Sequence, residues 1–245
     1  MNPAKALRQC VLHEDAAIVV VNKPAGVLTV PDRHDPSKLN VTAYLRSRYD
    51  NILIVHRLDR DTSGVLVFAR TAEAHRDLSL QFQNRTVTKH YRTLVAGQVA
   101  HDEGLIDKPI VPHPHIGGKM IVARKGKASQ TRYTVLERFQ RHTWLDVELL
   151  TGRTHQIRVH FLAQGYPLAV DPLYGKRAQL ALSDIKPGYR HPYPAEERPL
   201  LGRLSLHAAT LAIHHPDSKE RLTFEASLPK DLRALLQQLR KWAAI

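Results

Sequence analysis

The stretch His-Arg-Leu-Asp-Arg-Asp-Thr-Ser-Gly at residues 56–64 holds two carboxylates, two guanidiniums and an imidazole. A carboxylate in such a setting can attack an electrophilic carbon or take up a proton. The apolar run from Val65 to Ala69 follows directly and predicts a buried strand. So many polar groups cannot all be buried, so we expect a loop at a surface or cleft, positioned by that strand. A solvated charged turn is the alternative.

Two later segments carry further polar side chains at regular spacing. Residues 87–97 have the composition of a strand, in which Lys89, Tyr91 and Thr93 share one face. Residues 151–165 predict a loop followed by a helix, with Thr154 as its N-cap and Gly165 as its C-terminal stop. Arg158 then lies in the first turns of that helix.

Together these three segments resemble the RluA-type family of RNA pseudouridine synthases. The family's motifs occur in the family's order: the His-Arg-Leu-Asp-x-x-Thr-Ser-Gly loop, the Lys-x-Tyr strand and the Thr-Gly-Arg-x-His-Gln-Ile-Arg helix. Shorter matches lie at 21–26, 126–128 and 206–208. The resemblance runs from about Ala17 to Leu228.

The resemblance implies an α+β pseudouridine synthase fold, with a long, mostly antiparallel mixed sheet, flanking helices and a central RNA-binding cleft. The chain's own pattern agrees, because many strands with few helices and no regular alternation favour α+β. We expect residues 1–245 to form a single catalytic domain. The first strand is expected by about Ala17, which leaves no room for a separate N-terminal RNA-binding domain.

The implied reaction breaks the bond from N1 to C1′ of a uridine, turns the base and rejoins it through C5. It needs no redox step, so no cofactor is expected. Asp59 matches the family's catalytic aspartate, and either attack on C1′ or removal of a sugar proton remains open. The neighbouring Asp61 is the rival carboxylate, but its position in the family pattern is variable.

The resemblance also assigns roles around Asp59. Arg158 is its expected ion-pair partner, which would keep the carboxylate ionised in a secluded pocket. Tyr91 would pack against the target base and assist removal of the C5 proton. The base must be flipped out of its stack, and Arg57 would fill the space it leaves. Further substrate contacts are expected from His56, Arg60, Lys89, Arg153 and Thr154, with Lys125 and Lys127 as additional phosphate contacts.

The composition supports an RNA partner. The formal net charge is +13 and the sequence pI is about 10.0, which favours a polyanion because phosphate neutralisation releases counterions. No apolar stretch approaches the roughly 20 residues needed to span a membrane, and no signal peptide is evident, so we expect a cytoplasmic protein. The single cysteine, Cys10, excludes an internal disulfide. The spacing of the 15 histidines does not favour a metal site.

The remaining pattern predicts the supporting elements. Thr71 should cap a helix over about 72–84, and a strand should run from Trp144 to Leu150. Residues 106–130 should form a long loop or a loose hairpin, 176–203 a mobile surface excursion, and 206–226 an antiparallel hairpin. A last helix should begin at Pro229, with an apolar stripe of Leu232, Leu235, Leu236, Leu239 and Trp242.

The sequence therefore predicts a cofactor-independent pseudouridine synthase, expected to be a monomer, that modifies a stem-loop of 23S ribosomal or transfer RNA. Two other functions stay open. One is a non-catalytic RNA-binding protein of the same fold. The other is a nucleoside or glycoside hydrolase that uses Asp59 and Asp61 together.

Overall fold

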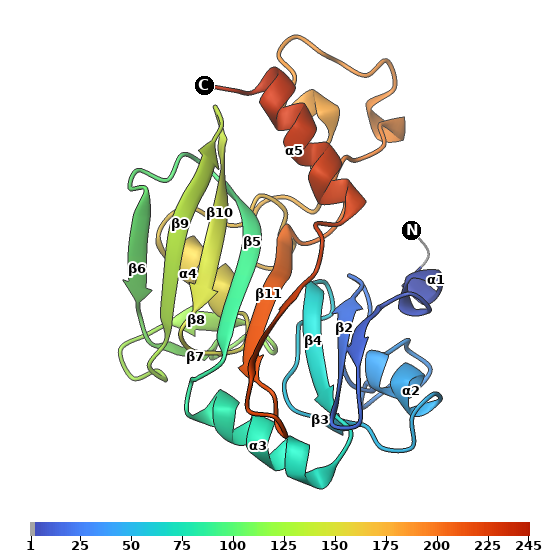
Figure 1. The fold of residues 1–245 in the computed structure, drawn as a ribbon. Coiled ribbons are helices and arrows are strands. Elements are labelled where there is room, and N and C mark those ends of the chain that lie inside the picture. The colour runs from blue at the N-terminus through green and yellow to red at the C-terminus, as the bar shows by residue number, and fades with distance from the viewer. Residues whose placement is uncertain (1–2) are drawn as a thin grey trace. The chain divides into compact units, whose positions relative to one another are not determined.

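The structure, a computed structural model, describes residues 3–245 and groups the chain into two compact units. The first unit comprises Met1–His90 with His207–Ser227, and the second comprises Tyr91–Leu206 with Leu228–Ile245. Each unit combines a mostly antiparallel sheet with a few helices (Figure 1). The predicted α+β class is confirmed. Because both units are built from separated segments, no single linker divides them.

The sheet of the first unit has the strand order β1-β2-β4-β11, with β3 paired to β4 and β12 paired to β11. Its pairings are antiparallel except that of β4 with β11, which is parallel. This one parallel pairing makes the sheet mixed. The strands are β1 (Val11–Glu14), β2 (Ile18–Lys23), β3 (Leu53–Ile54), β4 (Ser63–Ala69), β11 (Leu206–His214) and β12 (Arg221–Glu225). The helices are α1 (Pro3–Leu7), α2 (Val41–Arg46) and α3 (Ala72–Gln83).

Helix α3 begins where the sequence predicts. The Thr71 hydroxyl oxygen accepts a hydrogen bond from the Ala74 N–H at 3.1 Å, as an N-cap should. Ala74 and Leu78 are fully buried against the apolar side chains of β2 and β4. The helix therefore covers the strand that follows the 56–64 loop. Strand β1 was not predicted: it precedes the strand expected at Ala17, and a four-residue segment gives little periodicity.

The sheet of the second unit has the order β5-β10-β9-β6, and β7 and β8 form a separate hairpin. Strand β5 carries the chain from the first unit into the second at His90–Tyr91. The strands are β5 (Thr88–Ala96), β6 (Glu103–Asp107), β7 (Ile110–Pro112), β8 (Met120–Val122), β9 (Gln130–Arg138) and β10 (His142–Leu149). The helices are α4 (Gln156–Ala163) and α5 (Lys230–Trp242), with short 3₁₀ turns at Leu182–Asp184 and Pro194–Glu196. The predicted strands at 87–97 and 144–150 and the hairpin at 206–226 are confirmed.

Helix α5 is confirmed with Pro229 at its N-cap, and its four leucines are buried in the core of the second unit. The prediction for residues 176–203 is wrong in one respect. Leu180, Ile185 and Leu201 are buried in the same core, and Leu180 forms a β-bridge with Leu201. Apolar burial at both ends of the segment therefore anchors it beside α5 (Figure 1).

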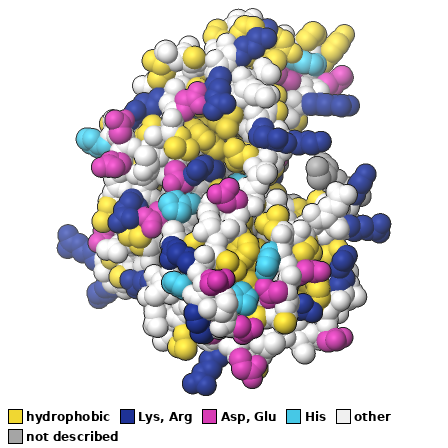
Figure 2. Space-filling view, viewed as in Figure 1, with side chains coloured by type: hydrophobic (Ala, Val, Ile, Leu, Met, Phe, Trp, Pro, Cys, Tyr) yellow, Lys and Arg dark blue, Asp and Glu magenta, His cyan; other side chains and the backbone are white. Residues whose placement is uncertain are grey.

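Four properties of the described residues bear on the predicted class of protein. None of the helices described within 3–245 is long and apolar enough to cross a membrane. Over the same residues, no cluster of three or more His, Cys, Asp or Glu side chains could hold a metal ion. Lys and Arg side chains project from much of the face shown in Figure 2. Cys10 is buried, and this burial raises the pKa of its thiol to about 11.

Candidate active site

The 56–64 loop connects β3 to β4 and is fixed on both sides of Asp59. The Leu58 N–H donates to the Thr29 hydroxyl at 3.2 Å, and that hydroxyl donates to the Leu58 carbonyl at 2.9 Å. On the other side, the Thr62 N–H donates to the Asp59 carbonyl at 3.1 Å and closes a turn. Leu58 itself is buried. Asp59 therefore lies, half-buried, on a turn whose backbone has little freedom.

A buried lysine adds a third restraint on this loop. Lys23 is fully buried, and its ammonium donates to the carbonyl oxygens of Pro24 at 3.1 Å, Val27 at 2.7 Å and Arg60 at 2.9 Å. The Gly26 N–H also donates to the Arg60 carbonyl, at 2.9 Å. The sequence showed only a short family match at 21–26. The Asn-Lys-Pro-Ala-Gly motif thus anchors the loop that carries Asp59.

The end of the loop rests on β11. The Ser63 hydroxyl lies 2.9 Å from Nδ1 of His207, whose Nε2 lies 3.0 Å from the Ala226 carbonyl. Gly64 adopts a φ of +118°, and a Cβ there would lie 2.0 Å from the Ala208 carbonyl oxygen. Only glycine allows this close approach of two backbones. Within the Leu-His-Ala match at 206–208, His207 and Ala208 therefore have a structural role in the first unit.

His56, an expected substrate contact, is held against β4 and α3. Its Nε2 accepts a hydrogen bond from the Val67 N–H at 3.2 Å, and its ring stacks on Phe82 at 4.5 Å between centroids. Burial and the nearby Lys89 ammonium lower the pKa of His56 to about 3. The ring is therefore neutral at pH 7. A direct contact with substrate stays a prediction.

The charged neighbours of Asp59 differ in their exposure. Arg57 and Arg60 are both exposed, whereas Asp61 is half-buried. The Arg60 guanidinium donates to Asp61 through Nε at 3.1 Å and Nη2 at 3.3 Å. The Asp61 carboxylate is therefore paired with the Arg60 guanidinium. The Arg57 side chain is accessible to solvent.

The predicted face of β5 is confirmed. Tyr91 is 8% exposed and Thr93 is fully buried, with the Thr93 hydroxyl donating to the Ser205 carbonyl at 2.8 Å. Lys89 is half-buried, with its ammonium 5.9 Å from the centroid of the Phe82 ring. Burial lowers the pKa of Lys89, and Arg85 adds to this effect.

Arg158 is held by a residue that the sequence analysis did not single out. Its Nε and Nη2 donate to the two carboxylate oxygens of Asp171, at 2.7 Å and 2.8 Å. The Leu173 and Tyr174 N–H groups donate to the same carboxylate, both at 3.0 Å. The Tyr174 ring lies 4.8 Å from the guanidinium carbon of Arg158. Asp171 thus fixes the plane of the guanidinium through two of its donors, and Nη1 is not used by this pairing.

The start of α4 corrects the predicted cap. The N-cap is His155, in the left-handed region at φ 55°, and not Thr154, which is exposed. The N-cap side chain accepts no helix N–H. The first helical residue instead holds the preceding loop: Oε1 of Gln156 accepts from the Arg153 N–H at 3.0 Å and from the Thr151 hydroxyl at 2.7 Å. The Arg153 side chain is half-buried. The helix end predicted at Gly165 is confirmed, because Gly165 follows the C-cap Gln164 with a φ of +83°.

Asp59 belongs to the first unit, and Tyr91 and Arg158 belong to the second. The pairing of Asp59 with Arg158 therefore stays a prediction. Each unit separately shows a positioned group suited to the expected chemistry: a half-buried carboxylate on a restrained turn, and a buried guanidinium oriented by Asp171.

Comparison with known proteins agrees with this chemistry. A family model described as RNA pseudouridylate synthase matches residues 17–163. The ribosomal large subunit pseudouridine synthase D of Nitrosomonas europaea is 41% identical over 242 residues, covering 97% of this chain and 67% of that protein. The protein of the same name from Pseudomonas aeruginosa is 40% identical over 238 residues, covering 94% and 72%. The chain belongs to the RNA pseudouridylate synthase family, and within it to the RluA type.

Solved structures show the same fold. Human RNA pseudouridylate synthase domain containing 1 matches with a TM-score of 0.68 at 28% identity, covering 94% of both chains. Human RNA pseudouridylate synthase domain containing 4 matches with a TM-score of 0.71 at 24% identity, covering 97% of this chain and 95% of that one. The predicted pseudouridine synthase fold is confirmed, and the protein is an RNA pseudouridine synthase, an isomerase that binds RNA as its substrate.

Proposed function

We propose that this protein converts one or more uridines of large-subunit ribosomal RNA to pseudouridine, with Asp59 as the carboxylate that acts on the sugar. The observation that carries the proposal is the position of Asp59, half-buried on a turn held by Thr29 on one side and Lys23 on the other. Relatives about 40% identical are named for the ribosomal large subunit, which supports the choice of RNA.

The reaction conserves every atom of the uridine. The bond from N1 to C1′ breaks, the base turns, a bond from C5 to C1′ forms, the C5 proton leaves and N1 gains a proton. Asp59 begins this sequence either by attack on C1′ or by removal of a sugar proton. Both routes need an ionised carboxylate with a fixed approach to the ribose, and a restrained turn provides that approach.

The other residues have separate roles in this proposal. Arg158, oriented by Asp171, provides the positive charge that keeps Asp59 ionised. Tyr91 packs against the flipped base, and its phenol assists removal of the C5 proton. Arg57, exposed beside Asp59, fills the gap left in the RNA stack. His56, Arg60, Lys89, Arg153 and Thr154 complete the substrate contacts.

The proposed substrate is an exposed stem-loop, because a base inside a continuous helix is costly to extract. A transfer RNA stem-loop is the other substrate to test. We propose that the chain acts as a monomer in the cytoplasm, and light scattering of the purified protein at several concentrations tests the oligomeric state.

Asp59→Asn tests the assignment of the carboxylate. This change keeps the size of the side chain and removes the ionised oxygen that either route requires. Unmodified 23S ribosomal RNA transcript is incubated with excess enzyme, and pseudouridine is mapped by carbodiimide labelling and reverse transcription. Wild type should produce stops at defined uridines, and Asp59→Asn should produce none while still binding the transcript.

Asp61→Asn is the matched control, since it removes an equal charge two residues away from a carboxylate already paired with Arg60. It should keep substantial activity. Pseudouridine formation by Asp59→Asn at the wild-type rate would contradict the assignment. Wild-type stops in transfer RNA and none in 23S RNA would move the proposed substrate to transfer RNA.

A further inference from the structure

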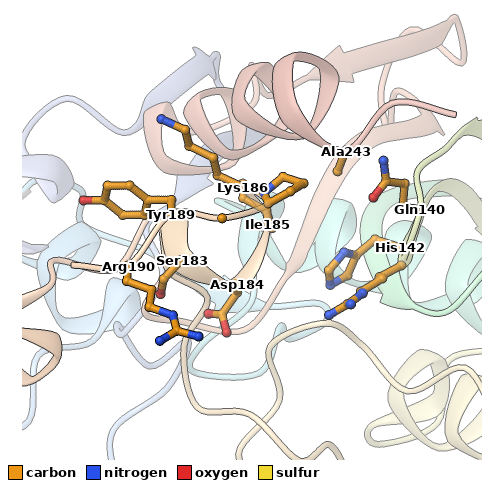
Figure 3. A pocket seen from close by; sticks show the side chains of 12 residues that line it. Gln140, His142, Ser183, Asp184, Ile185, Lys186, Tyr189, Arg190 and Ala243 are labelled. Atoms are coloured by element: carbon orange, nitrogen blue, oxygen red, sulfur yellow. The ribbon is translucent and has the colours of Figure 1, made fainter.

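A pocket of about 300 Å³ lies within the second unit, lined by the end of α5, the turn between β9 and β10, and residues 183–190 (Figure 3). None of the residues predicted for catalysis or substrate binding lines it. A volume of this size falls at the lower end of small-ligand sites. The pocket is therefore large enough for one nucleotide and separate in its lining from the expected catalytic residues.

Positive charge dominates the wall of this pocket. Arg141, Lys186 and Arg190 line it, with Asp184 as the acidic member. The Asp184 carboxylate is already engaged by the Arg177 guanidinium and by the Ala181 N–H. Arg177, which does not line the pocket, thus neutralises the charge of Asp184. The three basic side chains of the wall therefore leave the pocket with an excess of positive charge.

Two of these basic groups are available to a ligand. Arg141 and Arg190 are exposed, and within residues 3–245 neither side chain forms a hydrogen bond or an ion pair. Lys186 is held differently, with its ammonium 4.3 Å from the centroid of the Trp242 ring and 5.2 Å from that of Tyr189. These two cation–π contacts fix a positive charge at the pocket.

The wall also contains a buried neutral histidine. His142 is 7% exposed, and its Nδ1 has no hydrogen-bond partner among the residues that the structure describes. Figure 3 shows its ring pointing toward Asp184 across the pocket. Burial, with a smaller effect of Arg177, lowers the pKa of His142 to about 4. A neutral imidazole beside cations offers hydrogen bonding without added charge.

We propose that this pocket is a second RNA subsite, which holds one unpaired nucleotide of the substrate with its phosphate between Arg141 and Arg190. The proposal rests on the proposed function for the identity of the RNA, and it adds a contact that selects substrate without taking part in the isomerisation. A nucleotide stacked in a duplex cannot enter a pocket that is sized for one nucleotide, so the bound segment is single-stranded.

The local sequence favours RNA over a free anion. Residues 186–193, Lys-Pro-Gly-Tyr-Arg-His-Pro-Tyr, interleave aromatic rings with basic groups, and this combination suits stacking with phosphate neutralisation. Tyr193 is 66% exposed at the end of this run. The segment is anchored by buried Leu180, Ile185 and Leu201, so it presents these groups from a fixed base.

The double variant Arg141→Gln/Arg190→Gln tests the subsite. Its dissociation constant for unmodified 23S transcript is measured across a salt series. Two lost phosphate contacts should reduce the slope of log K against log salt by about 1.4, which corresponds to roughly 25-fold weaker binding at about 0.1 M salt. The single-turnover rate at saturating enzyme should match wild type, because neither arginine belongs to the predicted catalytic set.

Arg76→Gln/Arg233→Gln is the matched control, because both arginines are exposed, make no side-chain ion pair within 3–245 and lie outside the pocket. Thermal unfolding of both double variants should match wild type. If the pocket variant and the control bind RNA equally and with the same salt slope, the subsite proposal fails. If wild type binds RNA but isomerises no uridine in it, the proposed function fails. The comparison of RNA binding between the pocket variant and the control variant would still test the subsite.

Two further measurements identify the occupant. Photocrosslinking of 4-thiouridine-substituted transcript, followed by mass spectrometry, should place an adduct on the peptide that contains Lys186 to Arg190. Crosslinks only to other peptides would overturn the subsite. Free AMP offers the same chemistry, so it is titrated against wild type and the pocket variant by calorimetry. Suppose that AMP binds wild type but not the pocket variant, and that both proteins bind RNA with the same affinity. The ligand of the pocket would then be a free nucleotide, and the RNA subsite would be wrong.

Discussion

Asp171 meets Arg158 edge-on, with two hydrogen bonds of 2.7 Å and 2.8 Å between fully or nearly fully buried side chains. Removing one partner of such a pair leaves an uncompensated buried charge, which costs about 3–5 kcal/mol. Asp171→Ala should lower the free energy of unfolding by about that amount in urea titrations. Asp231→Ala is the control, because Asp231 pairs with Arg203 in the same geometry but is partly exposed. We expect a smaller loss in Asp231→Ala. Equal losses of unfolding free energy in the two variants would show that burial does not determine the stabilisation by the Arg158–Asp171 pair.

Gly64→Ala should be among the most destabilising single changes in the first unit. The added Cβ would lie 2.0 Å from the Ala208 carbonyl oxygen, on a backbone with φ of +118°, so we expect a loss of more than about 4 kcal/mol. Gly118→Ala is the matched control, since Gly118 has φ of +75° with no atom within 4 Å of the new Cβ. It should lose only about 1–2 kcal/mol for the left-handed backbone. Denaturant unfolding measures both, and a Gly64→Ala protein as stable as Gly118→Ala would contradict the close approach.

The sequence predicted well those elements whose signals are local. The Thr71 cap, the leucine stripe of α5 and the alternating face of β5 each depend on side chains a few residues apart. The cap of α4 was predicted wrongly because Gln156, inside the helix, bonds the preceding loop and leaves Thr154 exposed. The N-cap therefore falls one residue later, at His155, whose side chain accepts no helix N–H. A threonine before an apolar run is a sound cap signal only where the helix begins directly after it.

Residues that support the site were missed for a different reason. Lys23 is fully buried with its three donors used by carbonyls, whereas a lysine in a sequence is ordinarily expected at the surface. Asp171 lies 13 residues beyond Arg158 and outside its helix, so no periodicity connects the two. Such contacts are set by tertiary structure. The motif around Arg158 therefore identified the guanidinium, but it did not identify Asp171 as the residue that orients it.

The neutral histidines predict a pH dependence of stability. The pKa of His56 is lowered to about 3 and that of His142 to about 4 in the folded protein, whereas unfolded histidine titrates near about 6.5. Below about pH 6.5 the unfolded state therefore binds more protons, so stability is complete above that pH and falls as the pH drops toward 4. His56→Gln should weaken this dependence between about pH 6.5 and 5, where carboxylates still contribute little. Unfolding free energies measured across that range test it, and parallel curves for wild type and variant would show that His56 is protonated in the fold.

Arg57→Lys separates base flipping from binding. The substitution keeps the positive charge beside Asp59 but loses the planar guanidinium that can stack on bases and form several hydrogen bonds at once. The encounter with RNA depends on charge and should change little, while the flipped state loses the group that fills its gap. We expect the single-turnover rate to fall at least about tenfold, equivalent to about 1.4 kcal/mol in the barrier, with a modest change in the dissociation constant. Arg76→Lys is the control, because Arg76 is exposed, makes no side-chain ion pair within 3–245 and lies outside the predicted substrate contacts, and its rate should stay near wild type. A loss of binding as large as the loss of rate in Arg57→Lys would make Arg57 a phosphate contact instead.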